Sequence, residues 1–152
     1  MIYIIIILLI FSAFFSSLET ALFHLNSTSN KNEIVKNLLK KPKKLLSNLL
    51  TGNTIVNIAI GSLSAAYTLN HISPISDISI SKLLLIQVSI VTLIFLIFGE
   101  IIPKTYAIAQ SEKLANSSAK ILDLILKAIY PIAFIFHKLT DILINILPMK
   151  KE

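Results

Sequence analysis

The stretch MIYIIIILLIFSAFFSSLETALFHL (residues 1–25) determines the fold class, because it opens with an unbroken apolar run and becomes polar only in its second half. A helix of about 20 mostly apolar residues is long enough to cross the hydrocarbon core of a bilayer. The stretch lacks the basic amino-terminal region and the early small-residue cleavage signal of a secretory leader. It therefore predicts an uncleaved membrane span over residues 2–25.

The rest of the chain supports a membrane class. Of its 152 residues, 55% are hydrophobic, and the mean hydropathy of +0.80 exceeds that of an ordinary soluble domain. Further apolar stretches cover about residues 45–71 and 83–102, and the linking residues 71–81 hold Ser, Pro and Asp turn formers. These patterns predict an all-α integral membrane fold with three transmembrane helices.

The distribution of charge predicts the orientation. All fourteen cations are lysines, against eight acids, which gives a net charge of +6. Lysines gather in residues 31–44 and again from Lys104 to Lys151, with only Lys82 between the two groups. Because basic segments stay in the cytoplasm, we expect a multi-pass plasma membrane protein with its amino terminus outside and its carboxy terminus cytoplasmic. No arginine or interleaved aromatic accompanies these lysines, so nucleic acid is not an expected partner.

Two segments outside the spans have amphipathic patterns. Residues 30–41 mix lysines with Ile and Leu, which predicts a basic cytoplasmic helix that lies on the membrane and ends at Pro42. Residues 112–147 carry polar side chains opposite rows of Ile and Leu, which predicts juxtamembrane helices with a bend at Pro131. A fourth span is the alternative, although its apolar stretch, residues 128–136, is too short to cross a bilayer.

The third span carries the residue with the strongest functional signal. Glu100 follows a long uncharged stretch, and a carboxylate at membrane depth costs at least about 2.5–3.5 kcal/mol. Pro103 has no N–H to donate to the carbonyl four residues earlier, which belongs to Gly99. The sequence thus predicts a helix break with two oxygen donors, a half-site for a cation.

The other two spans each add an oxygen-bearing face. Ser12, Ser16 and Glu19 fall on one helical stripe of the first span, and Asn53 and Asn57 are one turn apart on the second. The sequence Thr-Gly-Asn at 51–53 is expected to interrupt the second helix. A structural role is the alternative for each: the serines would bond only their own backbone or a neighbouring helix, and the asparagines would only hold helices together.

Glu19 has two interpretations. It is either an additional cation ligand or the partner of Lys104 in an ion pair at the membrane boundary.

The donor types select the class of metal. Hydroxyl, amide, carbonyl and carboxylate oxygens suit Mg²⁺ or Ca²⁺, whereas zinc and copper prefer imidazole or thiolate. The chain has no cysteine, and its three histidines are scattered. No nucleophile–base pair or phosphate-binding glycine loop is present, so an enzyme is not expected.

Three motifs on successive spans resemble one known family. FSAFFSSLETAL (11–22), TGNTIVNIAIG (51–61) and FGEIIPKTYA (98–107) are similar to the signature stretches of the CorC/CNNM transmembrane domain. The resemblance implies a homodimer of three-helix subunits with a juxtamembrane helix belt. It also implies magnesium transport, with export coupled to Na⁺ entry as the expected mode, and a Mg²⁺ site made by the residues Ser12, Ser16, Asn53, Asn57, Gly99 and Glu100.

One part of the family pattern is not expected on this chain. Members usually continue into nucleotide-binding CBS domains, whereas this sequence stops at LPMKKE. Nucleotide binding is therefore not carried over.

Two hypotheses follow. In the first, the chain is a magnesium transporter domain whose helix breaks at 51–53 and Pro103 act as hinges. In the second, it is a membrane-anchored scaffold or interaction module whose polar stripes only hold the helices together.

Overall fold

The computed structural model describes the backbone of residues 1–25, 32–76 and 78–146, and within the last helix the side chains through residue 131 together with 134 and 138. Every regular element in these ranges is helical. Three helical segments are long and apolar enough to cross a membrane: Ile2–His24, Pro42–Ile75 and Ile80–Ala109. The predicted fold class, an all-α membrane protein with three spans, is confirmed.

The first span is the single helix α1 (Ile2–His24), and the other two are composite. The second joins α3 (Pro42–Tyr67) to a π-helical turn, η1 (Thr68–Ile72), and a 3-10 turn, η2 (Ser73–Ile75). The third joins α4 (Ile80–Ile94) to the π-helical η3 (Phe95–Ile101) and then α5 (Ile102–Ala109). The helical turns after residue 67 therefore occupy part of the predicted loop at 71–81.

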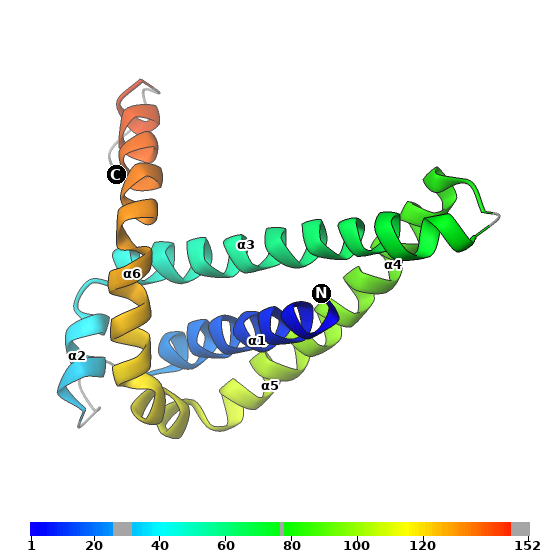
Figure 1. Ribbon diagram of the computed structural model, residues 1–152. Coiled ribbons are helices and arrows are strands. Elements are labelled where there is room, and N and C mark those ends of the chain that lie inside the picture. Colours follow the sequence, from blue (N-terminus) through cyan, green and yellow to red (C-terminus); the bar gives the residue numbers. More distant parts are fainter. Residues whose placement is uncertain (26–31, 77, 147–152) are drawn as a thin grey trace.

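Two helices lie at one end of the spans. The short α2 (Glu33–Leu39) falls within the predicted basic helix, whose residues 30 and 31 lie outside the described part. The long α6 (Ser111–Ile146) runs across the ends of α1 and α3, and α2 lies against it (Figure 1). This position agrees with the predicted juxtamembrane helix, and α6 is absent from the candidate spans found in the described residues. The α-helix continues through Pro131.

The hydrophobic core lies where α1, α2, α3 and α6 meet. The buried face of α6 recurs at helical spacing through Ala115, Ala119, Leu122 and Leu126, as expected for an amphipathic helix. The other core side chains are Phe15, Leu18, Leu22, Val35, Leu45 and Leu49. Asn32 caps α2 by accepting from the Ile34 N–H and donates to the Asn116 carbonyl on α6, 3.4 Å away. The core thus fixes α2 and α6 to the spans.

The two predicted helix breaks differ from expectation. Thr51-Gly52-Asn53 lies inside regular α-helix, so the predicted interruption of the second span is wrong. Glycine lowers helix propensity by about 1 kcal/mol relative to alanine but does not remove a hydrogen bond. Near Pro103 the helix is not broken but π-helical: the Ile102 N–H bonds to the Ile97 carbonyl five residues earlier. Pro103 has no N–H to donate to the Gly99 carbonyl, and the register shifts just before it, whereas the missing side chain of Gly52 removes no hydrogen bond.

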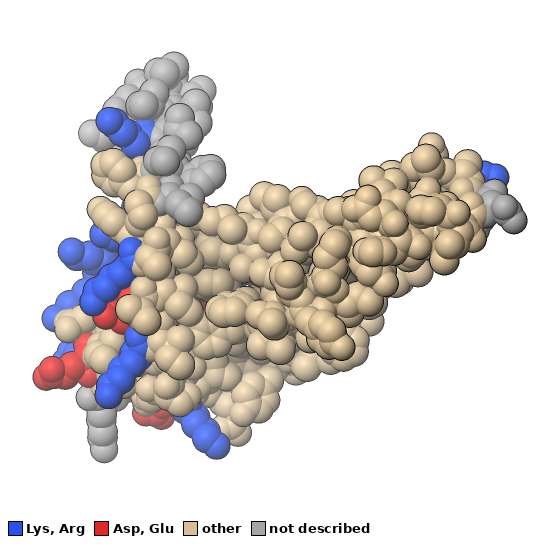
Figure 2. Space-filling view, in the orientation of Figure 1, with Lys and Arg blue, Asp and Glu red and all other residues tan. Residues whose placement is uncertain are grey.

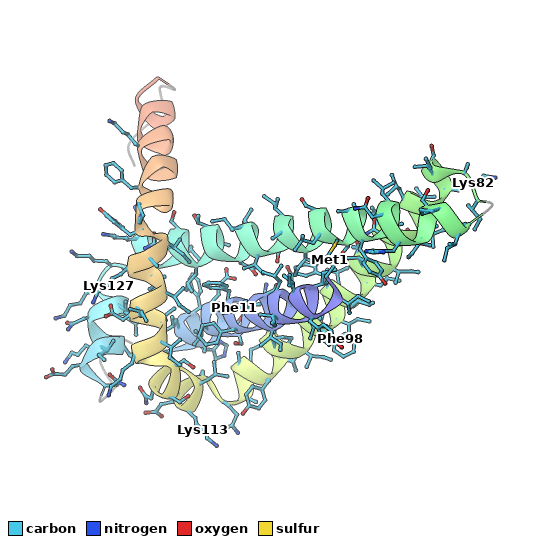
Figure 3. All side chains as sticks on the ribbon, in the orientation of Figure 1. Met1, Phe11, Lys82, Phe98, Lys113 and Lys127 are labelled. Atoms are coloured by element: carbon cyan, nitrogen blue, oxygen red, sulfur yellow. The ribbon has the colours of Figure 1, made fainter. Side chains whose placement is uncertain are left out.

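Most of the charge of the described molecule gathers at one end (Figure 2). Figure 2 shows most lysines gathered over α2 and the adjoining part of α6, while the face of the spans turned toward the viewer shows almost no charge before the far tip. Lys82 lies at the opposite tip, far from Lys113 and Lys127 (Figure 3). The apolar middle matches a bilayer, and the basic end matches one membrane surface.

Candidate cation site

Three predicted ligands from two spans meet at one point. The Ser12 hydroxyl, on α1, lies 3.0 Å from Asn57 Oδ1 and 3.2 Å from Asn53 Oδ1, both on α3. Ser12 is completely buried. The helical spacing of Asn53 and Asn57 places both amides on the face of α3 that packs against α1. The sequence predicted this grouping, and the structure brings it together.

The three oxygens form an electron-rich group. A hydroxyl has one proton, so Ser12 can donate to Asn53 or to Asn57 but not fully to both. The remaining short contact then joins two oxygens that both carry lone pairs. A bound cation would satisfy all three oxygens at once, because each can serve as a ligand for a hard metal ion.

Ser16 extends this group by one turn of α1. Its side chain is fully buried, and its Oγ has no hydrogen-bond partner among the described residues. Leaving a buried polar group unsatisfied costs about 1–3 kcal/mol. The Ser16 hydroxyl, on the same helix stripe as Ser12, can therefore still bind an ion or a water molecule.

The third span reaches the site through Gly99. This residue is buried, and a Cβ placed on it would lie 3.3 Å from Ser12 Oγ and 3.0 Å from the Phe95 ring. The absence of a side chain thus lets the η3 backbone approach the Ser12 hydroxyl. Figure 3 labels Phe11 and Phe98, the residues immediately before Ser12 and Gly99.

Glu100 is adjacent to this contact but makes no polar contact of its own. It is half-buried and forms no hydrogen bond or ion pair with a described residue. No contact places its carboxylate on Ser12 or the asparagines. Its role as a ligand therefore stays a prediction, as does that of the Gly99 carbonyl.

Gly52 supports the site and was not among the predicted site residues. A Cβ here would lie 2.8 Å from Ile129 of α6 and 2.9 Å from the Phe15 ring of α1. The missing side chain of Gly52 therefore lets α1, α3 and α6 pack closely together, next to Asn53 in the chain. A small residue in a membrane helix signals close packing, but the sequence does not say which side chains it meets.

Glu19 and Lys104 do not form the alternative ion pair. Among the described residues the one ion pair joins Lys127 to Asp123 on the surface of α6, at 2.7 Å. Glu19 instead lines a mainly apolar pocket of about 300 Å³ beside Leu22 and Leu45. Glu19 thus lies in a different pocket from the oxygens around Ser12, and it has no ion-pair partner among the described residues.

The described residues hold no group of three or more His, Cys, Asp or Glu side chains that could bind a metal. The oxygens that the structure groups around Ser12 are a hydroxyl and two amides, all neutral. Such a site suits a hard cation that keeps part of its hydration shell.

Comparison with known proteins agrees with the motifs. Residues 3–152 match the family described as the cyclin M (CNNM) transmembrane N-terminal domain. The chain belongs to the CNNM family. This finding confirms the resemblance of the three span motifs to the CorC/CNNM transmembrane domain.

This CNNM chain matches only part of the length of two bacterial relatives. A UPF0053 protein of Haemophilus influenzae is 35% identical over 98% of the chain and 36% of the relative. The UPF0053 inner membrane protein YfjD of Escherichia coli is 29% identical over 93% of the chain and 33% of the relative. The chain therefore spans about a third of the length of these relatives.

Proposed function

We propose that this membrane domain binds and transports Mg²⁺ through the oxygen group of Ser12, Asn53 and Asn57. The observation that carries the proposal is the convergence of the buried Ser12 hydroxyl and the side-chain oxygens of the half-buried Asn53 and Asn57, with one hydroxyl proton among them. Octahedral Mg²⁺ with metal–oxygen distances of about 2.1 Å places adjacent ligands about 3.0 Å apart. An ion could therefore accept a lone pair from each of these oxygens with little movement, while the Ser12 hydroxyl keeps its proton and turns it away from the ion.

The remaining ligands would come from both sides of this group. Ser16 offers a hydroxyl without a partner, and Gly99 and Glu100 bring a carbonyl and a carboxylate on the third span. The carboxylate would supply the charge that neutral oxygens cannot. Mg²⁺ gives up water reluctantly, so some hydration would remain in the site.

Polar side chains continue along α3 on the far side of the site. Ser64 lies two helical turns after Asn57, is buried, and its Oγ has no described partner. Gln87 on α4 also carries a buried oxygen without a described partner. These groups supply oxygens for an ion path toward the tip that carries Lys82.

The proposed orientation follows from the lysines. Basic ends of membrane proteins face the cytoplasm, so α2 and α6 would lie on the inner surface and the Lys82 tip outside. The hinge proposal changes in one respect: regular α-helix at Gly52 leaves η3, before Pro103, as the flexible element. Net export with Na⁺ as the coupling ion is the proposed direction.

A homodimer is proposed as the working unit. The most apolar window of the third span is only 6% buried within one chain, so lipid or a second copy must cover it. Light scattering of the purified protein would give the stoichiometry.

The test compares two serines in membrane helices. Ser12→Ala removes the central hydroxyl, whereas Ser89 only bonds the carbonyl of Leu85 on its own helix. In proteoliposomes, we expect Ser12→Ala, Asn57→Ala and Glu100→Ala to abolish Mg²⁺ flux and Ser89→Ala to retain it. Equal flux from Ser12→Ala and Ser89→Ala would refute the site.

The scaffold hypothesis gives a different result in a binding experiment. An ion that binds only the folded state raises thermal stability as its concentration rises above its dissociation constant. We expect Mg²⁺ to stabilise the Ser89→Ala variant but not Ser12→Ala. If the polar groups only hold helices together, neither variant will respond to Mg²⁺.

A further inference from the structure

A second polar site lies at the basic end, away from Ser12. It is a pocket of about 210 Å³ formed by α2, α3 and α6. Three lysines line it, Lys41, Lys44 and Lys127, with Asp123 as the one acid. Because Asp123 is paired with Lys127 at 2.7 Å, the lining keeps an excess of two positive charges.

The wall of this pocket contains a buried amide without a partner. Asn48 is 4% exposed, its Oδ1 is buried, and no described residue bonds to it. Leaving a buried acceptor without a donor is unfavourable, because the group has lost its hydrogen bonds to water. A ligand that fits this pocket would therefore place an anionic group beside the lysines and a hydrogen-bond donor beside Asn48 Oδ1.

Local structure prepares the cationic side of the pocket. The Lys44 ammonium lies 3.9 Å from the centre of the Tyr130 ring, a cation–π contact that holds it between α3 and α6. The helix α3 begins at Pro42, and its amino-terminal end has no side-chain cap. Free N–H groups at that end add to the attraction for an anion.

We infer that this pocket binds the headgroup of an anionic phospholipid that carries hydroxyls, such as phosphatidylglycerol. The phosphate would contact Lys41 and Lys44, and a headgroup hydroxyl would donate to Asn48 Oδ1. A lipid is favoured over free phosphate because the pocket lies where α3 enters the apolar region, with Leu38, Leu45 and Leu126 also lining it. The lipid would join α2 and α6 to the span that carries Asn53 and Asn57.

The test measures lipid retention by native mass spectrometry of the purified protein. Phosphatidylglycerol, phosphatidic acid and phosphatidylcholine with identical acyl chains are compared, and inorganic phosphate is the competitor. A lysine near an anionic surface contributes about 1 kcal/mol, so Lys41→Gln and Lys44→Gln should each weaken phosphatidylglycerol binding about fivefold. Lys82→Gln, at the opposite tip, is the matched control and should leave binding unchanged.

The acceptor is tested separately with Asn48→Leu, which keeps the approximate volume and removes the amide. We expect wild type to prefer phosphatidylglycerol over phosphatidic acid, which has no headgroup hydroxyl, and this variant to lose that preference. Lys41 and Lys44 are exposed, so their variants decide the question if Asn48→Leu does not fold. Equal weakening by Lys82→Gln, equal binding of phosphatidylcholine, or displacement by inorganic phosphate would each overturn the inference.

Discussion

Gly52 and Gly99 occupy comparable places, each beside a predicted ligand in a membrane helix, yet the chain around them differs. At Gly52 the α-helix is regular, and the missing side chain makes room for Ile129 and Phe15. At Gly99 the helix is π-helical and the backbone approaches Ser12. The difference arises because Pro103 removes an N–H from the second region and nothing removes one from the first. At Gly52 glycine therefore permits close packing without changing the helix, and the altered register near Gly99 accompanies Pro103.

Gly52→Ala tests the packing side of this comparison and should have the largest effect on stability. The added methyl would lie 2.8–2.9 Å from Ile129 and Phe15, and overpacking of this kind costs about 1–3 kcal/mol. We expect a clear fall in the thermal midpoint measured without Mg²⁺. An unchanged midpoint would mean that α6 does not pack on Gly52 in solution.

Gly99→Ala should have a smaller effect on stability and a distinct effect on the ion. Its methyl would meet the edge of the Phe95 ring at 3.0 Å and Ser12 Oγ at 3.3 Å, which small shifts can relieve. We expect a loss of about 1 kcal/mol together with weaker stabilisation by Mg²⁺, measured as the midpoint against ion concentration. If Mg²⁺ stabilised this variant as much as the original chain, η3 would not be part of the ion-binding site.

Pro103→Ala tests the hydrogen-bond side of the comparison. Alanine restores the N–H, so the Gly99 carbonyl can be bonded in the α register and is no longer available to an ion. Stability should change by less than about 1 kcal/mol, because the regained hydrogen bond offsets the loss of proline rigidity. Mg²⁺ affinity, from calorimetric titration, should fall roughly tenfold. Wild-type affinity would show that the free carbonyl is not a ligand.

Gly61→Ala is the control for both glycines and should have the smallest effect. Apart from the local backbone of its own helix, nothing described lies within 4 Å of a Cβ at this position, and alanine favours a helix by about 0.5–1 kcal/mol over glycine. We expect a thermal midpoint equal to or slightly above that of the original chain. A loss as large as that of Gly52→Ala would contradict the packing explanation.

The sequence predicted the features that depend on local pattern. Apolar runs of sufficient length indicated the three spans, and the four-residue spacing of Asn53 and Asn57 indicated a single polar face. The amphipathic pattern after residue 112 indicated a long helix, and α6 occupies that stretch. Each of these follows from helical periodicity and from the cost of exposing polar groups to lipid.

The features that depend on distant contacts could not be predicted. Thr-Gly-Asn looked like a break because glycine is a poor helix former, but Phe15 and Ile129 pack there and stabilise the helix. The π-helical register before Pro103 and the pocket beside Asn48 arise from how separate helices meet. Ser12 was predicted as one ligand among six, and only the fold shows it between both asparagines.

The most direct test of the central claim is a crystal structure determined with Mn²⁺, whose anomalous scattering marks the position of a hard divalent cation. We predict a peak within about 2.0–2.3 Å of the oxygens of Ser12 and Asn57, lost on competition with excess Mg²⁺. A peak located elsewhere, or an Asn53–Ser12–Asn57 group unchanged and without metal, would contradict the account.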